Sequence, residues 1–152
     1  DLVVSPSGSG LTHAGFLAGL RARSDQTRVI GACVRRAAPL QKERIRTVAD
    51  ALQDLVDAPL NVADADIDVR DAALAPGYGR IGRPAIAAMR MAAQEEGMIL
   101  DPVYSAKTFA TILEMRDVGE IPRGARVLFL HTGGLAAVFA YGDEIRKALA
   151  EL

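Results

Sequence analysis

Two hydrophobic patterns alternate along this chain. Apolar runs without polar interruption are typical of strands buried on both faces of a sheet, and they predict strands at residues 2–4, 28–34, 98–100 and 126–130. Between these runs, apolar side chains recur at steps of three and four residues, which predicts amphipathic helices. The expected helices cover residues 12–23, 39–55, 84–96, 105–118 and 141–152.

The long helix that begins near Pro39 shows the helical pattern most clearly, and Pro is favourable in a first turn. Its apolar stripe consists of Ile45, Val48, Leu52 and Leu55. Two further strand candidates, at residues 60–62 and 67–69, are short and contain acidic residues. They are followed by a Gly- and Pro-rich loop at residues 75–84, in which glycines flank Tyr78 on both sides.

Predicted strands and helices therefore alternate over the whole chain. Such alternation is typical of a mostly parallel sheet with helices packed on both faces, so we expect a three-layer α/β fold. A chain of 152 residues is long enough for one domain with its own core, and we expect residues 1–152 to form a single domain. Aromatic residues make up only 5% of the chain, and its largely aliphatic apolar content suits helices packed on a buried sheet.

Charge and composition exclude several classes of partner. The chain carries 18 basic and 19 acidic residues, a net charge of −1, which gives no electrostatic footprint for nucleic acid or an anionic membrane surface. No apolar run is long enough to span a bilayer. Two histidines and one cysteine serve a metal site poorly. The single Cys33 favours a reducing compartment, so we expect a cytoplasmic location.

A Gly- and Ser-rich turn links the first strand to the first helix. Gly8 and Gly10 let the backbone close around an anion, and the N–H groups and dipole of the following helix favour negative charge. The hydroxyls of Ser7, Ser9 and Thr12 add donors at the same place. We interpret this turn as a phosphate cradle, while an ordinary strand-to-helix connection is the alternative reading of the same residues.

Two more polar or glycine-rich turns follow predicted strands, at residues 100–105 and 131–134. Ligands of parallel α/β sheets bind beyond the carboxyl ends of the strands, so the three turns are expected to face one crevice. Common nucleotide and hydrolase motifs do not fit the first turn. It lacks the third glycine of a dinucleotide-binding fingerprint, the Gly-Lys-Ser/Thr of a Walker loop and the Gly-x-Ser-x-Gly of a hydrolase elbow.

Four segments taken together resemble one family. They are Ser-Gly-Ser-Gly-x-Thr-His-Ala-Gly at residues 7–15, Gly-Tyr-Gly at 77–79, Glu-Gly-x-Ile-Leu-Asp-Pro-Val-Tyr-x-x-Lys at 96–107 and His-Thr-Gly-Gly at 131–134. In this order they are similar to the pyridoxal-phosphate enzymes of the tryptophan synthase β type (fold type II), in the branch of D-cysteine desulfhydrase and 1-aminocyclopropane-1-carboxylate (ACC) deaminase. The resemblance implies pyridoxal 5'-phosphate as the cofactor, a small amino acid as the substrate, and the large-domain part of that fold.

The resemblance also implies roles for individual residues. Tyr78 and Tyr104 match the two active-site tyrosines of that branch, which contact the substrate and move protons. Thr132 lies where the pyridine nitrogen of the cofactor is met. The deaminases carry Glu where this chain has Ser105, and a hydroxyl there makes the ring a weaker electron sink. The expected reaction is therefore β-elimination giving pyruvate, ammonia and sulfide, as in D-cysteine desulfhydrase. The cofactor-binding residues implied are Ser7, Gly8, Ser9, Gly10, Leu11, Thr12, Ser105 and Thr132.

ACC deaminase activity is one alternative, and a domain that binds another phosphorylated ligand or a non-catalytic interaction domain are the others. The family's Schiff-base lysine and a Ser-Asn-His-like substrate-binding stretch lie in an N-terminal part that has no match here, and Lys42, Lys107 and Lys147 are not expected to replace that lysine. We therefore expect this chain, which begins at Asp1, to be the C-terminal, cofactor-binding portion of a longer enzyme. It is expected to be inactive alone, to need its N-terminal half, and to form a homodimer.

Overall fold

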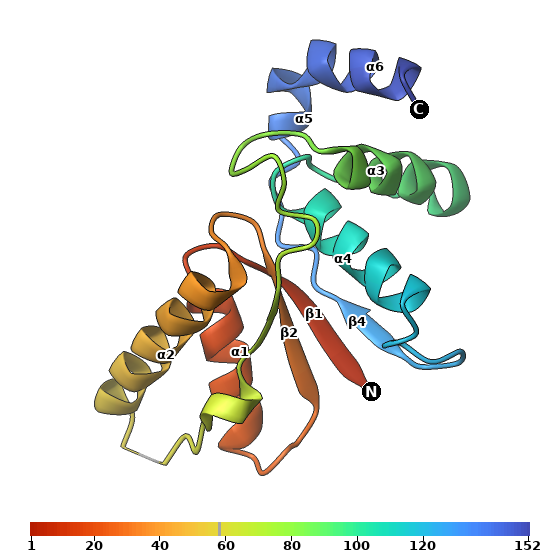
Figure 1. Ribbon diagram of the computed structural model, residues 1–152. Helices are drawn as coiled ribbons and strands as arrows, with labels where there is room; N and C mark the ends of the chain where they lie inside the picture. The colour runs from red at the N-terminus through yellow and green to blue at the C-terminus, as the bar shows by residue number, and fades with distance from the viewer. Residues whose placement is uncertain (58) are drawn as a thin grey trace.

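Four parallel strands form one sheet in this computed structural model, which describes residues 1–57 and 59–152 (Figure 1). The strand order is β3-β2-β1-β4, so β1 lies inside the sheet. Its register pairs Leu2 with Arg28 of β2 and with Val127 of β4. The strands are β1 (Leu2–Ser7), β2 (Arg28–Cys33), β3 (Asp68–Arg70) and β4 (Val127–Phe129).

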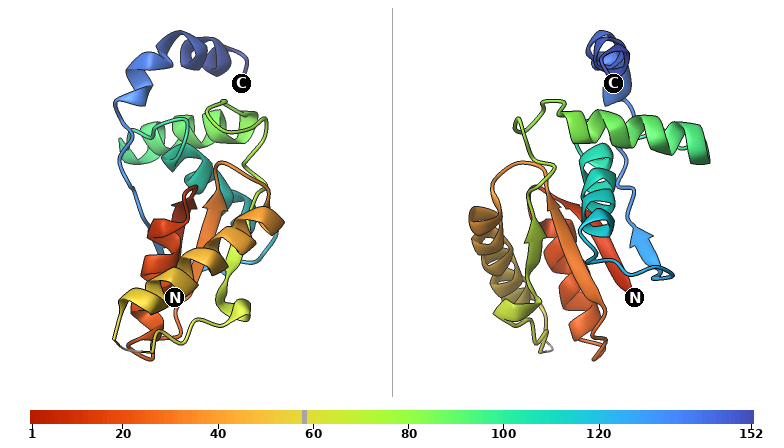
Figure 2. Two further views of the ribbon diagram at one scale, coloured as in Figure 1. Left: turned by 90° about the vertical axis from the view of Figure 1, so that its left-hand side faces the viewer. Right: turned by 45° about the vertical axis from the view of Figure 1, so that its right-hand side comes forward.

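Helices cover both faces of this sheet, as Figures 1 and 2 show: α1 (Leu11–Arg21) and α2 (Ala38–Leu55) on one face, α4 (Ser105–Asp117) on the other. Successive side chains of a strand point to opposite faces. Val3 therefore packs in the cluster with α1 and α2, whereas Val4 packs against Met115 of α4. The expected three-layer α/β fold with a mostly parallel sheet is confirmed.

A second group of helices extends the molecule beyond the sheet (Figure 1). α3 (Arg83–Glu96) packs on α4, and α6 (Gly142–Ala150) packs on α3 after the short α5 (Ala137–Ala140). Their shared cluster has buried aliphatic side chains at its centre, with Phe109, Phe129 and Tyr141 packed against them. These helices therefore extend the fold beyond the sheet through their packing on α4.

Two of the expected strands are wrong. Residues 60–62 and 98–100 are irregular, and a short 3-10 helix, η1 (Asp64–Asp66), precedes β3. Leu100 is nonetheless fully buried, because it packs in the cluster of α3, α4 and α6. The apolar run at 98–100 is thus buried against helices. A short run of apolar residues does not by itself distinguish burial against helices from burial in a sheet.

Some helix details also differ from expectation. α1 ends at Arg21, two residues before the predicted end, whereas α4 begins at Ser105 as predicted, with Tyr104 as its N-cap residue. Leu55 at the end of α2 is 82% exposed, so the buried part of the predicted stripe ends before it. The ends of helices fray and bury less side-chain area than their middles. The apolar periodicity of the sequence therefore extends beyond the residues that are buried in the structure.

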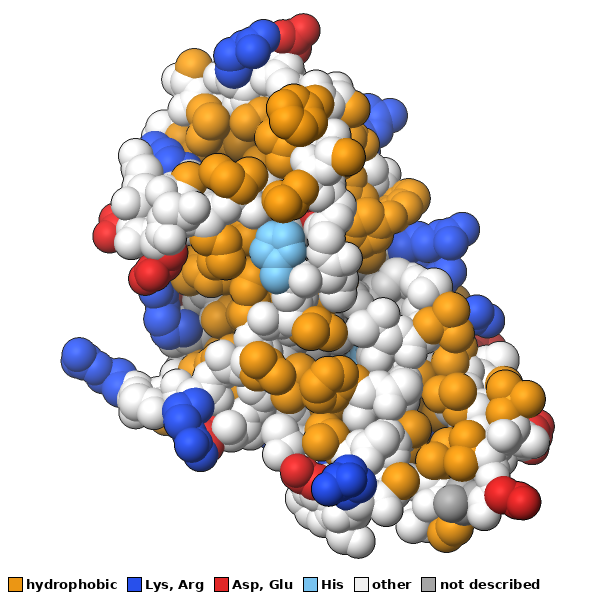
Figure 3. Space-filling model, turned by 180° about the vertical axis from the view of Figure 1, so that it is seen from behind, with side chains coloured by type: hydrophobic (Ala, Val, Ile, Leu, Met, Phe, Trp, Pro, Cys, Tyr) orange, Lys and Arg blue, Asp and Glu red, His pale blue; other side chains and the backbone are white. Residues whose placement is uncertain are grey.

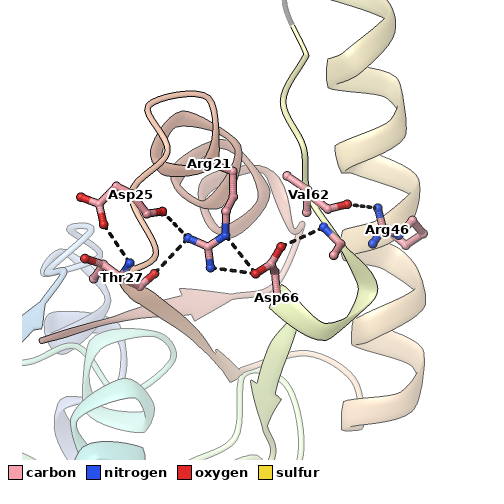
Figure 4. A network of polar contacts seen from close by, with 7 residues as sticks. Arg21, Asp25, Thr27, Arg46, Val62 and Asp66 are labelled. Carbon is pink, nitrogen blue, oxygen red and sulfur yellow. Dashed lines mark hydrogen bonds and ion pairs between the residues drawn. The ribbon is translucent and has the colours of Figure 1, made fainter.

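A network around Arg21 ties α1 to the segment that leads into β3 (Figure 4). Arg21 is 7% exposed, and its Nε donates to Asp66 Oδ1 at 2.9 Å. Its Nη1 donates to the carbonyl oxygens of Asp25 and Thr27 at 2.6 and 3.3 Å. This guanidinium links residues that precede β2 and β3, at the amino-terminal ends of the strands and opposite to the predicted crevice.

Apolar side chains also gather on one outer face of the molecule (Figure 3). Exposed large apolar residues include Phe139, which is 89% exposed, together with Ile99, Leu128 and Leu135. None of the helices in the described ranges combines the length and apolarity that a membrane crossing would need.

Candidate active site at the carboxyl ends of the strands

Three turns that lie far apart in the sequence line one cavity of about 230 Å³. The first turn follows β1, the second precedes α4, and the third follows β4. The lining residues are Pro6, Gly8, Ser9, Thr12, Tyr104, Thr132 and Gly134. The expectation that the three turns face one crevice is thus met by the arrangement of the described residues.

The turn after β1 leads directly into the N-terminus of α1. Gly10 is the N-cap residue and has φ of 92°, a left-handed conformation that disfavours any residue with a side chain. The first N–H groups of a helix have no acceptor within the helix, and here Leu11 N–H reaches Ser9 Oγ at a long 3.4 Å. Partial positive charge is therefore concentrated at the cavity wall.

Two arginines of the neighbouring segment orient the peptide groups of this turn. Arg36 Nη1 donates to the carbonyl oxygen of Gly8 at 2.6 Å, and Arg44 Nε donates to that of Ser9 at 2.9 Å. In a trans peptide the C=O and the next N–H point in opposite directions. The N–H groups of Ser9 and Gly10 therefore point away from the arginines, which is the polarity that an anion cradle requires.

A buried polar group supports the cradle from beneath. Ser7 Oγ accepts a hydrogen bond from Gln41 Nε2 at 2.8 Å and lies 3.3 Å from His13 Nδ1. All three side chains are fully buried. Burial disfavours the charged imidazole and lowers the pKa of His13 to about 4, so the ring is neutral at pH 7.

Asp101 shapes the turn that carries Tyr104. Its buried carboxylate accepts hydrogen bonds from the N–H groups of Val103, Tyr104 and Ser105 at 2.7 to 2.8 Å, and from Ser105 Oγ at 2.6 Å. A Cβ atom on Gly134 would lie 2.8 Å from Asp101 Cγ. The turn after β4 reaches the Asp101 turn this closely only because residue 134 is a glycine.

The two predicted catalytic tyrosines meet beside the cavity that Tyr104 lines. Tyr78 Oη and Tyr104 Oη are 2.6 Å apart, with the rings edge to face at a centroid distance of 6.3 Å. The hydrogen bond between Tyr104 and Tyr78 together with burial raises the pKa of Tyr104 to about 12. The Arg35 guanidinium carbon lies 5.8 Å from the centre of the Tyr78 ring, a cation–π distance.

The structure separates the predicted cofactor-binding residues into two groups. Gly8, Ser9, Thr12 and Thr132 line the cavity, as does Tyr104. The remaining four have no side chain in its lining. Ser7 is turned toward His13 and Gln41, Ser105 toward Asp101, Leu11 is 61% exposed, and Gly10 contributes backbone only.

Several supporting residues were missed by sequence reasoning. Asp101 carries a recognisable signal, since Asp before a turn that opens a helix commonly accepts backbone N–H groups. Arg36, Gln41 and Arg44 carry none, because their partners lie 28 to 35 residues away in the sequence. His131 Nε2 bonds the carbonyl oxygen of Ile99 at 3.2 Å.

Comparison with known proteins gives one matching family. The sequence profile described as "Pyridoxal-phosphate dependent enzyme" matches residues 1–133. A D-cysteine desulfhydrase of Yersinia pestis is 36% identical over 143 residues, which cover 94% of this chain and 43% of that protein. A Pyrococcus furiosus protein provisionally named 1-aminocyclopropane-1-carboxylate deaminase is 34% identical over 149 residues, or 98% of this chain and 44% of the relative.

A solved structure agrees with these sequence relatives. The crystal structure of an ACC deaminase homologue superimposes with a TM-score of 0.87 and 30% identity, covering 98% of this chain and 44% of the other. The chain thus spans less than half the length of the relatives that it matches.

Proposed function

This chain belongs to the family of pyridoxal-phosphate-dependent enzymes, and from that premise we propose that it is the cofactor-binding part of a lyase that acts on a small amino acid. One observation carries the proposal: Gly8, Tyr104 and Thr132, taken from three separate turns, line a single cavity. In this proposal residues 8–12 hold the phosphate of the cofactor, Thr132 meets its ring, and Tyr78 and Tyr104 face the substrate.

The donor set of the cradle fits a phosphate group. Backbone N–H groups of Ser9 and Gly10 point away from Arg36 and Arg44, and they have no acceptor among the residues that the structure describes. The N-terminus of α1 and the hydroxyl of Thr12 add to them. When bound, pyridoxal phosphate supplies an electron sink for negative charge that develops on the substrate next to its amino group.

The tyrosine pair suits proton transfer at the substrate. A phenol held 2.6 Å from a second phenol has a fixed direction for its proton, and one of the two donates while the other accepts. The raised pKa of Tyr104 keeps that group protonated at pH 7. We assign Tyr104 as the nearer group to the reacting atoms, because it lines the cavity and Tyr78 does not.

Within the branch we favour desulfhydrase chemistry over ACC deamination. The Ser105 hydroxyl donates to Asp101 and is buried, whereas Thr132 lines the cavity, so we propose that Thr132 meets the ring nitrogen. A neutral hydroxyl stabilises a protonated pyridine less than a carboxylate does. A weaker electron sink suffices for loss of a thiolate, which is a good leaving group, and suits opening of a cyclopropane less well. Proteins with both names are among the relatives.

The Schiff-base lysine is proposed to come from outside residues 1–152. Lys107 Nζ donates to the carbonyl oxygens of Leu74 and Gly77 at 2.8 and 2.6 Å and does not line the cavity. Lys42 and Lys147 are exposed. We therefore propose that an N-terminal half completes the site, that this chain alone has no activity, and that the whole enzyme is a cytoplasmic homodimer.

A charge placed in the cradle tests the assignment of the phosphate. In Ser9→Asp the new carboxylate lies at the N-terminus of α1, where it is favourable for the helix and unfavourable for a bound anion. We expect affinity for pyridoxal 5'-phosphate to fall about tenfold or more, since adjacent like charges cost on the order of 1–2 kcal/mol. Titration followed by the backbone amide NMR signals of Ser9, Gly10 and Thr12 measures this affinity.

Two controls separate phosphate recognition from a general effect of charge. Ser24→Asp adds the same charge beyond the opposite end of α1, and pyridoxal without phosphate probes the ring alone. Affinity for the phosphorylated ligand should fall only in Ser9→Asp, and affinity for pyridoxal should stay unchanged. Equal affinity of both variants for pyridoxal 5'-phosphate would contradict the assignment.

A further inference from the structure

The loop that carries Tyr78 closes on itself. A Cβ atom on Gly82 would lie 2.1 Å from the carbonyl oxygen of Ala75, so the two ends of the loop touch at a position that only glycine permits. Gly77 and Gly79, on either side of Tyr78, have φ of 142° and 66°. Tyr78 itself is 51% exposed. A loop of this kind needs other contacts to hold one conformation.

Lys107 of α4 supplies one such contact. It is fully buried in α4, and its Nζ donates to the carbonyl oxygen of Gly77 at 2.6 Å and to that of Leu74 at 2.8 Å. No carboxylate pairs with it among the ion pairs of residues 1–57 and 59–152. An ammonium group buried without a counter-ion is unfavourable for folding, so its presence calls for an explanation other than stability.

Tyr141 supplies a second contact from above. Its hydroxyl donates to the carbonyl oxygen of Gly79 at 2.8 Å. The residue lies at the junction of α5 and α6, and its ring packs against the cluster of Ile86, Leu100 and Ile145. The donor is therefore held on a rigid part of the molecule.

We propose that Lys107 and Tyr141 are positioning residues, which grip the peptide groups on both sides of Tyr78 and so hold its hydroxyl on that of Tyr104. Lys107 lies in α4 and Tyr141 lies between α5 and α6, and neither residue lines the cavity. This inference rests on the proposed function only in giving the tyrosine pair a catalytic purpose. The proposed geometry, in which the hydrogen bonds from Lys107 and Tyr141 hold the Tyr78 hydroxyl on that of Tyr104, is testable without cofactor or substrate.

Tyrosine ionisation gives a direct readout of that hydrogen bond. The chain has three tyrosines and no tryptophan, so absorbance of tyrosinate near 295 nm comes only from Tyr78, Tyr104 and Tyr141. The Tyr78 hydrogen bond contributes most to the pKa of about 12 at Tyr104. Loss of the hydrogen bonds from Lys107 and Tyr141 should therefore lower the pKa of Tyr104 toward the ordinary tyrosine value of about 10.

The main variants are Lys107→Met, which keeps an unbranched side chain without the donor, and Tyr141→Phe, which keeps the ring without the hydroxyl. Tyr104→Phe identifies the signal of Tyr104. Lys42→Met repeats the Lys-to-Met change at an exposed site, and Met115→Ala disturbs the packing of α4 on the sheet away from the loop. Circular dichroism confirms at each pH that a variant is folded.

At about pH 11 we expect Lys107→Met to show about 0.4 to 0.8 additional ionised tyrosine per chain relative to wild type, which corresponds to a drop of about one to two units in the pKa of Tyr104. Tyr141→Phe should lower that pKa in the same direction. Lys42→Met and Met115→Ala should leave it unchanged. A pKa of Tyr104 that stays near 12 in Lys107→Met overturns the proposal.

If Lys107→Met does not fold, Tyr141→Phe decides alone by the same criterion. A drop in Met115→Ala equal to that in the main variants also overturns the proposal, because it would attribute the effect to general loosening. Failure of this experiment leaves cofactor binding at the cradle intact. Failure of the Ser9→Asp experiment, in turn, leaves the positioning of Tyr78 by Lys107 and Tyr141 intact. The two proposals can therefore be refuted separately.

Discussion

Gly31 in β2 shows how one missing side chain determines the interior of the site. A Cβ atom at this position would lie 2.3 Å from His13 Nδ1 and 2.8 Å from Ser7 Cβ. The imidazole therefore occupies the space above β2 and reaches Ser7 Oγ. Its Nε2 has no hydrogen-bond partner in the described part of the chain, and burial makes a charged ring unfavourable at this position.

This burial predicts how stability depends on pH. The pKa of His13 is about 4 in the folded chain, below the ordinary value of 6.5. Between these two values the unfolded chain binds the proton and the folded chain does not, so stability falls as the pH is lowered from 6.5 to 4 and is fully present above 6.5. The loss expected from this group is about 3 kcal/mol.

Urea unfolding at intervals between pH 7 and pH 4 measures that loss. His13→Gln has no titrating ring and should lack this part of the slope, while His131→Gln changes a histidine that is not buried and should keep it. Carboxylates contribute to both curves, so the difference between each variant and wild type is the quantity compared. A slope in His13→Gln identical to that of wild type would refute the prediction.

At the scale of elements, ion pairs of this chain differ in importance with their burial. Arg21 is 7% exposed and joins α1, the turn before β2 and η1 through four contacts. Arg126 is 87% exposed and pairs with Asp1 at the chain terminus. Buried pairs that lose one partner leave an uncompensated charge, whereas exposed pairs contribute little.

We therefore expect Arg21→Met to lower the free energy of unfolding by about 2 kcal/mol or more, because Asp66 and two carbonyl groups lose their donor. Arg126→Met is the matched control, with an expected change within about 0.5 kcal/mol. Chemical denaturation at pH 7 measures both. Similar losses in the two variants would show that Arg21 acts only as a surface charge.

At the scale of the whole molecule, the group formed by α3, α5 and α6 carries part of the exposed apolar surface. A groove of about 420 Å³ lies between α3 and α6, and its lining is mostly apolar, with Met89, Ile99, Val138 and Leu149 among its residues. Phe139 of α5 is 89% exposed. Contiguous apolar surface of this kind marks contacts with other protein surface, and the relatives are more than twice as long as the part matched here.

Phe139→Asp tests whether this surface mediates self-association. We expect the chain to associate in sedimentation equilibrium at micromolar concentrations and Phe139→Asp to weaken that association about tenfold, because it places a charge in an apolar contact. Leu55→Asp is the control, since Leu55 is 82% exposed at the far end of α2. Equal association of the two variants would argue that this face has no part in it.

The sequence determined the strands and helices that follow from local patterns. The runs at 2–4 and 28–34 became β1 and β2, and the stripes with steps of three and four became α1 to α4. The parallel alternation then placed the turns after β1 and β4 at one end of the sheet, because right-handed crossovers return every strand in the same direction. The meeting of Gly8 and Thr132 was predictable for that reason, whereas the strand expected before Tyr104 is absent and Tyr104 reaches the cavity from the start of α4.

Only the tertiary structure decided which side chains line the cavity and which hold the lining residues in place. Ser7 and Ser105 carry the same hydroxyl as Ser9, yet His13, Gln41 and Asp101 turn the first two away. Lys107 reads in the sequence as one more polar residue of a helix, and its bonds to carbonyl groups 30 and 33 residues away are invisible there. Local patterns record which residues are buried, whereas the direction of a hydrogen bond depends on peptide groups brought close by folding.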